Sequence, residues 1–402
     1  MRKLFRGSAM LILGIAVLLL ASRSDDGEIT DDGKTPDYIT IHGRQFDMSL
    51  TRLDLRGLSL QNEDIIPLRY MVNLERLVMT GCRIFGSQLN DLSPLANLTN
   101  LELLELGSNQ ISDLSPLANL TNLERLELRS NHIRDLSPLT NLTNLVWLNL
   151  SNNRIENLRP LADLKNLKQL HLGTIGRISD LTPLTNLTNL TVLSLQSNRI
   201  TDLSPLANLV NLVRLEVGGI IHVSDLTPLA NLTNLESLHL HGSHGSQIND
   251  LSPLANLTNL TNLSLLNNQI SDVTPLTNLT NLESLNLENN QINDLSPLVN
   301  LTNLEKLYLG RNQISDLTPI AVFVNLERLC FLSNQISNLA PLTNLTNLRW
   351  LTFGNNQVSD ITPLSGLEAL DTLELTNNPI TDWSPISHMR HVQGRPILDR
   401  LW

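Results

Sequence analysis

The chain has 402 residues, a formal net charge of −11, 41% hydrophobic residues and only 3% aromatic residues. This acidic balance contains no tract of clustered lysine and arginine, which binding to a phosphate backbone requires. The composition therefore argues against a nucleic-acid partner.

Residues 1–24 have the pattern of a targeting segment. Arg2, Lys3 and Arg6 precede an apolar run that ends near Ala21. This run is shorter than the ~20 residues of a membrane-spanning helix, so we expect a signal peptide. Retention of the segment as a membrane anchor is the alternative. The acidic stretch 25–37 follows and is predicted to be a linker.

Residues 38–72 are predicted to form an N-terminal cap. Within it, 38–46 (YITIHGRQF) indicates a hairpin and 49–60 indicates a degenerate first strand. The segment 62–71 (NEDIIPLRYM) indicates a short helix in place of the turn that follows later strands. A solenoid needs such covers because each coil contacts only its neighbours.

Residues 73–390 consist of fourteen copies of a 22-residue unit, N-L-x-x-L-x-L-x-x-N-x-I-x-D-L-[ST]-P-L-x-x-L-x. This pattern matches the leucine-rich-repeat signature. The remaining residues, 391–402, are predicted to be a partial C-terminal cap or tail. The repeat places Cys82 and Cys330 far apart, beyond the reach of a disulfide, so we expect two free thiols.

The spacing within one unit predicts the shape of a coil. Leu126 and Leu128 alternate with polar residues, which indicates a short strand with its leucines on one side. Asn131 follows the strand and is expected to bond backbone groups buried at the turn. Ser115 and Pro116 indicate a short helical turn on the outer side, with the hydroxyl capping its start. Leu117 and Leu120 are expected to hold this turn against the core.

These units resemble the internalin-type, 22-residue class of bacterial leucine-rich-repeat proteins. The resemblance implies an α/β fold: a right-handed solenoid with a parallel β-sheet on the concave face and short helical turns on the convex face. It also implies that the concave sheet binds a protein partner. Neither an immunoglobulin-like module nor an LPxTG-type motif follows the repeats in this sequence, so wall attachment is not expected from it. The same class includes phosphatase regulators, which is the related alternative if the first segment is not a signal.

Residues that alternate with the strand leucines are predicted to face the concave surface. In one column, Lys306, Arg328 and Trp350 occupy consecutive units, and Tyr308 and Leu332 lie beside them. Arg125 and Trp147 form a similar pair farther upstream. Tryptophan and arginine are typical of binding hot spots and can stack cation over ring, so we predict partner binding here; scattered surface residues are the simpler interpretation.

A histidine-rich stretch interrupts the regular units. Insertions in four units fall where the strand leads into the turn, and two of them carry His222 and His244 close to His239 and His241. Zinc needs three or four ligands in tetrahedral geometry, which a Gly/Ser loop does not assure. We therefore predict no metal site and expect these histidines to serve recognition at the rim.

The predicted function is that of a non-enzymatic protein-binding module without a cofactor. The sequence has no phosphate-binding glycine loop, no G-x-S-x-G motif and no H-E-x-x-H motif. Arg328 is expected to lower the pKa of Cys330, but no partner histidine is in evidence for a nucleophilic role of this thiol. The chain is expected to be a monomer, secreted or at the cell surface. The alternative is a structural or adhesive surface element that contacts cell-wall or glycan ligands.

Overall fold

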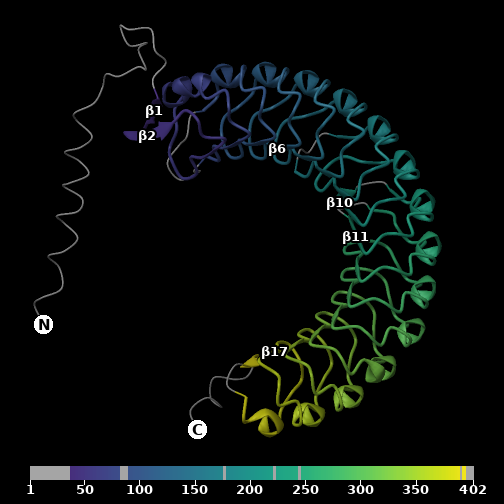
Figure 1. Cartoon of the computed structure of the whole chain (residues 1–402). Helices are drawn as coiled ribbons and strands as arrows, with labels where there is room; N and C mark the ends of the chain where they lie inside the picture. Colours follow the sequence, from purple (N-terminus) through teal and green to yellow (C-terminus); the bar gives the residue numbers. More distant parts are fainter. Residues whose placement is uncertain are drawn as a thin grey trace, which may run out of the picture.

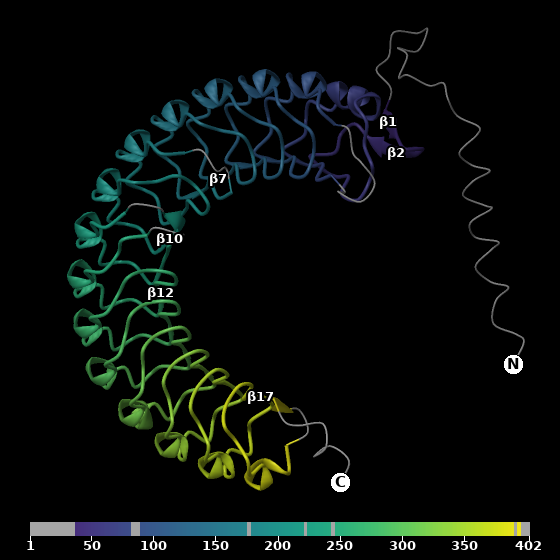
Figure 2. The ribbon, with the colours of Figure 1, turned by 180° about the vertical axis from the view of Figure 1, so that it is seen from behind.

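The computed structural model describes residues 37–81, 89–174, 178–220, 223–242, 246–389 and 392–394. These ranges coil into an open arc with strands along its inner edge and helical turns along its outer edge (Figures 1 and 2). The predicted fold class is confirmed. The predicted signal segment, linker residues 25–36 and most of 391–402 lie outside the described residues. Within the described ranges, no helix is both long enough and apolar enough to span a membrane.

The strands of the described residues form two sheets. A two-stranded antiparallel hairpin, β1 (Tyr38–Ile41) with β2 (Arg44–Asp47), precedes the arc, where the sequence indicated it. The other sixteen strands form one parallel sheet in strict chain order. They are β3 (Arg52–Asp54), β4 (Arg76–Val78), β5 (Leu103–Glu105), β6 (Arg125–Glu127), β7 (Trp147–Asn149), β8 (Gln169–His171), β9 (Val192–Ser194), β10 (Arg214–Ile220), β11 (Ser237–Gly242), β12 (Asn262–Ser264), β13 (Ser284–Asn286), β14 (Lys306–Tyr308), β15 (Arg328–Cys330), β16 (Trp350–Thr352), β17 (Thr372–Glu374) and β18 (Val392–Gln393).

Short 3₁₀ helices return the chain from one strand to the next. The first, η1 (Glu63–Tyr70), is the longest and stands where the sequence predicted a short helix. The others are η2 (Ser93–Leu95), η3 (Ser115–Leu117), η4 (Ser137–Leu139), η5 (Arg159–Leu161), η6 (Thr182–Leu184), η7 (Ser204–Leu206), η8 (Thr227–Leu229), η9 (Ser252–Leu254), η10 (Thr274–Leu276), η11 (Ser296–Leu298), η12 (Thr318–Val322), η13 (Ala340–Leu342), η14 (Thr362–Leu364) and η15 (Ser384–Ile386).

One continuous leucine core lies between the strands and these turns. Leu126 and Leu128 of the strand region and Leu117 and Leu120 of the turn region are fully buried, as expected. Burying each such side chain stabilises the fold by roughly 2 kcal/mol. Because the leucines of one coil are covered by those of the adjacent coils, every coil depends on its neighbours for most of its stability.

A buried asparagine ladder satisfies the backbone at the inner turn. The Asn131 Nδ2 group donates to the carbonyls of Leu106 and Leu128, both at 3.0 Å. Its Oδ1 atom accepts the N–H of Ile111 at 3.1 Å. The side chain thus joins its own coil to the preceding one, as the sequence predicted.

The residue before the ladder asparagine reverses the chain in the left-handed backbone region. Ser130 has φ of 60° and Asn152 has φ of 56°. Short polar residues tolerate this conformation better than bulky or β-branched ones. The equivalent Arg311, at 56°, shows that the turn imposes its geometry even on a long side chain.

The helical turns begin differently from the prediction. We expected the Ser or Thr hydroxyl to cap the turn, but no side chain of the residue at the start of η3 does so. Instead, the carboxylate of Asp113, two residues earlier, accepts the backbone N–H of Ser115 at 2.8 Å. The hydroxyl prediction was wrong because Ser115 is already the first residue of the turn, and its own N–H is the orphan donor that needs an acceptor.

The insertions coincide with longer strands. β10 and β11 extend beyond the three residues of their neighbours, and their pairing shifts register between Gly218 and Ile220. Gly219 has φ of 74° at this irregularity, a conformation suited to glycine. Most inserted residues, including His222 and His244, lie outside the described ranges.

The asparagine ladder leads to a stability prediction. Asn312→Ala orphans the buried N–H of Ile292 and removes bonds to the carbonyls of Leu287 and Leu309. We expect a loss of about 3 kcal/mol in the free energy of unfolding. Exposed Asn303 donates only to the Thr280 carbonyl, so Asn303→Ala should cost less than about 1 kcal/mol. Urea titration of both variants measures these two losses in the free energy of unfolding. Equal costs for the two variants would contradict this role.

The aspartate caps predict acid destabilisation. Backbone and hydroxyl hydrogen bonds from Ser252 and Ser296 lower the pKa values of Asp250 and Asp294 in the folded chain. The resulting stability is present above the unfolded pKa of about 4 and is lost as the pH falls through the lower folded pKa values. We therefore expect the melting temperature to drop as the pH is lowered below about 4.

Asparagine substitutions separate the cap from its charge. Asn157 and Asn338 accept the same N–H bond in two units, so the amide fits this position. A variant with Asp250, Asp272 and Asp294 changed to Asn should melt near the parent temperature at pH 7 and lose less stability in acid. The matching Ala variant should melt lower at pH 7 because it lacks the acceptor. Indistinguishable melting of the two variants at pH 7 would argue against the cap.

Candidate functional site

The concave face brings together the main residues that the sequence singled out. Strands β14, β15 and β16 pair in register, so that Lys306, Arg328 and Trp350 are direct neighbours. The Lys306 and Trp350 side chains are half-buried and Arg328 is exposed. Tyr308 and Leu332, also partly exposed, lie beside this row. We refer to these five residues as the C-terminal patch.

Within the C-terminal patch, Trp350 packs against tyrosine. The ring centroids of Tyr308 and Trp350 are 6.2 Å apart and their planes are tilted by 55°. This distance and tilt are those of a favourable aromatic pair. The cation–ring stack that we expected of arginine and tryptophan is not present between Arg328 and Trp350 in the described structure.

Cys330 explains how Tyr308 reaches across a whole coil. It stands between Tyr308 and Thr352 in the sheet, and its small side chain is only 4% exposed. Burial raises the pKa of the Cys330 thiol to about 11, and the Sγ–H group contacts Glu288 Oε1 at 3.3 Å. The expectation of a lowered pKa near Arg328 was wrong because loss of hydration outweighs any nearby positive charge. Cys330 is a free, buried thiol, whereas Cys82 lies outside the described residues.

Arg125 and Trp147 do form the predicted stack. The Arg125 guanidinium carbon lies 3.6 Å from the centre of the Trp147 ring, and its Nε atom is 3.7 Å from Glu105 Oε1. The ring of His171 lies 5.6 Å from that of Trp147. We call Arg125, Trp147 and His171 the N-terminal patch. Trp147 is thus held between two side chains of its own chain.

Burial shifts the pKa values of His171, in the N-terminal patch, and of Glu127 beside it. Desolvation lowers the pKa of His171 and thereby favours the neutral ring at pH 7. Desolvation also raises the pKa of Glu127, although that carboxylate accepts bonds from the Arg129 N–H and the Asn149 amide. Both shifts reflect the dense packing of side chains on this part of the sheet.

His239 and His241 lie together on β11. Their rings stack with centroids 5.5 Å apart, and their Nε2 atoms contact Asn262 Oδ1 and Ser264 Oγ at 3.2 and 2.8 Å. Burial lowers the pKa of His241. The described residues contain no group of three or more metal-ligating side chains, and the other two metal candidates, His222 and His244, are outside the described ranges.

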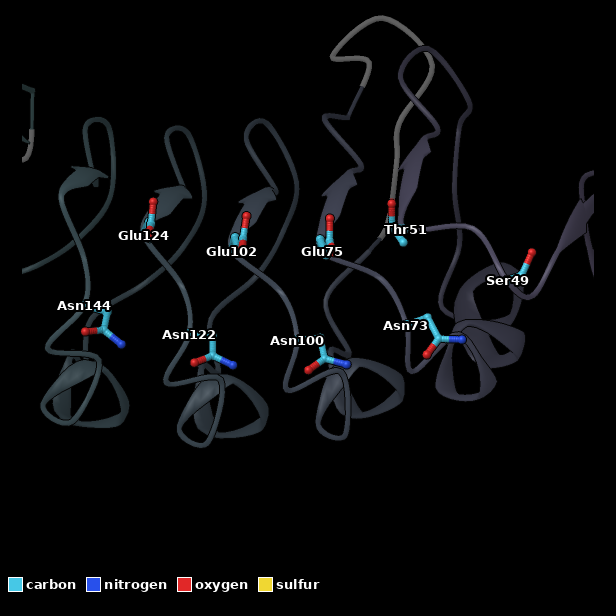
Figure 3. Close-up of a pocket in the computed structure, with 9 residues that line it drawn as sticks. All are labelled: Ser49, Thr51, Asn73, Glu75, Asn100, Glu102, Asn122, Glu124 and Asn144. Carbon is cyan, nitrogen blue, oxygen red and sulfur yellow. The ribbon is translucent and has the colours of Figure 1, made fainter.

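Two shallow grooves run along the flank of the sheet and were not predicted from the sequence. The first, of about 450 Å³, passes the start of the arc and is lined by Glu75, Glu102 and Glu124 on one side and asparagines on the other (Figure 3). The second, of about 590 Å³, repeats this arrangement with Glu283, Glu305 and Glu327. The signal was present in the sequence as glutamates directly before successive strands.

Most asparagines of the grooves donate a hydrogen bond to a carbonyl of the preceding coil. Asn100 and Asn122 donate through Nδ2 to the carbonyls of Val72 and Thr99 in the preceding coils. Their Oδ1 atoms and the carboxylates of the glutamates remain as acceptors along the groove. The flank of the sheet is therefore acidic.

Comparisons with known proteins agree with this architecture. The family of Leucine Rich repeats (2 copies) matches residues 99–141, 143–186, 188–231, 258–300, 280–322 and 346–388. A comparison with curated proteins found no match.

Two solved structures identify the family of this chain more narrowly than the repeat family does. A leucine-rich-repeat protein of Leptospira interrogans is 27% identical, with 86% of this chain and 89% of that chain covered and a TM-score of 0.73. The internalin InlF of Listeria monocytogenes is 36% identical over 96% of this chain and 95% of that chain, with a TM-score of 0.65. The chain therefore belongs to the internalin family of leucine-rich-repeat proteins.

Proposed function

We propose that this chain is a non-enzymatic binding protein, secreted or exposed at the cell surface, that recognises a protein partner through its concave sheet. The observation that carries the proposal is the pair of partly exposed rings, Tyr308 and Trp350, beside exposed Arg328. Aromatic and arginine side chains of this kind supply most of the binding energy in protein interfaces.

The C-terminal patch suits a partner better than the N-terminal patch. Arg125 lies over the Trp147 ring and His171 lies beside it, so the chain itself already uses part of that aromatic surface. Trp350 has Tyr308 near it, and its neighbour on the next strand is the small Thr372. The side of Trp350 toward β17 is thus less crowded by large side chains.

The fold supports a binding role over an adhesive one. Core leucines, ladder asparagines and capping aspartates recur from coil to coil, whereas the outward strand residues differ between coils. Such variation on a rigid scaffold supports recognition of one shaped partner. The surface location rests on the predicted signal segment 1–24 and on the family resemblance.

Substitution of the two rings tests the anchor. In affinity capture and titration with residues 25–402, Tyr308→Ala with Trp350→Ala should raise the Kd for the captured protein at least about thirtyfold, since hot-spot truncations cost about 2 kcal/mol or more. Tyr38→Ala, which removes an exposed ring outside the parallel sheet, should leave affinity unchanged. Unchanged affinity of the correctly folded double variant would show that the C-terminal patch does not bind the partner. Capture of purified wall polysaccharide without any protein would instead support the adhesive alternative.

A further inference from the structure

The charges of the concave sheet are sorted by position along the strand. We define the central column as the first residues of strands β3 to β17. It contains no acidic side chain, although the chain carries a net charge of −11. Its basic members are Arg52, Arg76, Arg125, Arg214, Lys306 and Arg328.

The columns on either side have the opposite character. The third residues of the same strands include Asp54, Glu105, Glu127, Glu216 and Glu374 and no lysine or arginine. The residues directly before the strands include the six glutamates of the two grooves, three of which are drawn beside their strands in Figure 3. Lys168 and Arg349 are the basic members of this column among the described residues. The basic side chains of the central column therefore lie between two columns, here called the acidic borders, in which acidic side chains outnumber basic ones.

Stacking like charges in neighbouring coils opposes folding. Arg52 is the register partner of Arg76, and Lys306 is the register partner of Arg328. Strands lie about 4.8 Å apart, and like charges directly opposite one another destabilise a sheet. The core does not need these residues, because the same position accepts Ser237, Asn262 and Ser284 in other coils.

Most of this positive charge has no counterion within 4.0 Å among the described residues. Of the six basic residues in the central column, only Arg125 has a carboxylate of a described residue within 4.0 Å, namely that of Glu105 at 3.7 Å. Arg52, Arg76, Arg214 and Arg328 are exposed, and Lys306 is half-buried. Their ammonium and guanidinium groups are available to an external ligand.

We infer that the central column recognises carboxylate side chains of an acidic protein partner. This inference rests on the proposed function and deepens it by specifying the chemistry of the partner. Guanidinium groups pair with carboxylates through two parallel hydrogen bonds, which fixes orientation as well as charge. The Lys306–Arg328 pair lies beside Trp350, so that charge pairing and ring contact act on the same part of the partner.

The acidic borders select against a polyanion such as a nucleic acid. A phosphate backbone carries closely spaced charges and would pass near the glutamates on the flank. An acidic protein surface carries discrete carboxylates, which can face the column while neutral or basic side chains face the borders. The charge pattern thus favours a folded protein or peptide of mixed composition.

Charge removal on and off the column tests the inference in the full chain. The probes are a fluorescent decapeptide in which glutamate alternates with glycine (the glutamate peptide), the matching lysine–glycine decapeptide (the lysine peptide) and an oligothymidylate of similar length, measured by anisotropy at low ionic strength. The wild-type chain should bind the glutamate peptide most tightly. Lys306→Gln with Arg328→Gln should weaken that binding about fivefold, which corresponds to two exposed charge pairs.

A matched variant controls for the change in net charge. Arg134 and Arg154 are exposed and lie outside the strands. Arg154 directly follows a ladder asparagine, and Arg134 stands three residues after another. Arg134→Gln with Arg154→Gln changes the net charge equally and should leave the peptide affinity unchanged. Equal losses in both double variants, or tighter binding of the lysine peptide, would overturn the inference. Tighter binding of the oligothymidylate would replace the acidic protein with a nucleic acid.

The outcome separates this inference from the proposed function. A captured protein whose affinity is insensitive to Lys306→Gln and Arg328→Gln, but sensitive to the ring substitutions, leaves the proposed function standing and refutes the acidic partner. Binding of the glutamate peptide without capture of any protein would support a carboxylate site on the central column and would contradict the proposed function. Identical melting temperatures of both double variants show that the comparison concerns binding and not folding.

Discussion

The fold depends on the asparagine side chain that closes most of the described inner turns. A coil with a leucine interior must bury backbone groups where the strand ends, and an unpaired buried N–H costs about 1–3 kcal/mol. Asn131 resolves this by accepting the Ile111 N–H and donating to two carbonyls, one in its own coil and one in the preceding coil. Since the next asparagine also donates to the Leu128 carbonyl, the coils are joined into one ladder.

That constraint determines where specificity can reside. The ladder, the buried leucines and the capping aspartates leave few positions free to vary, and most of these lie on the strands facing the concave side. Two tryptophans at the same strand position show what such freedom permits. Trp147 is stacked under Arg125, whereas Trp350 packs against Tyr308 because the buried Cys330 leaves room between them. The side chains of the neighbouring coils thus determine which part of a ring is open to a partner.

The sequence was sufficient for the fold and for the adjacency of Lys306, Arg328 and Trp350, because both follow from the period of the repeat. The sequence did not predict side-chain contacts where two side chains compete for one position. The repeat does not say whether Arg328 or Tyr308 packs on Trp350, nor that burial of Cys330 outweighs a nearby positive charge. The cap was misassigned to Ser115 because a hydroxyl and the Asp113 carboxylate both fit the local pattern, and only the backbone geometry distinguishes them.

Two columns of like charge run along this solenoid, and their surroundings differ. In the capping column, hydrogen bonds from Ser115 lower the pKa of Asp113, while Coulomb repulsion from the neighbouring Asp135 acts in the opposite direction. Each one nevertheless binds a Ser or Thr N–H of its own coil, so a local structural role offsets the repulsion. Arg328 and Lys306 of the central column have no such hydrogen bond or ion pair with the described residues. No hydrogen bond or ion pair among the described residues offsets the repulsion between these cations, and their positions therefore support the inferred carboxylate-bearing partner of the concave sheet.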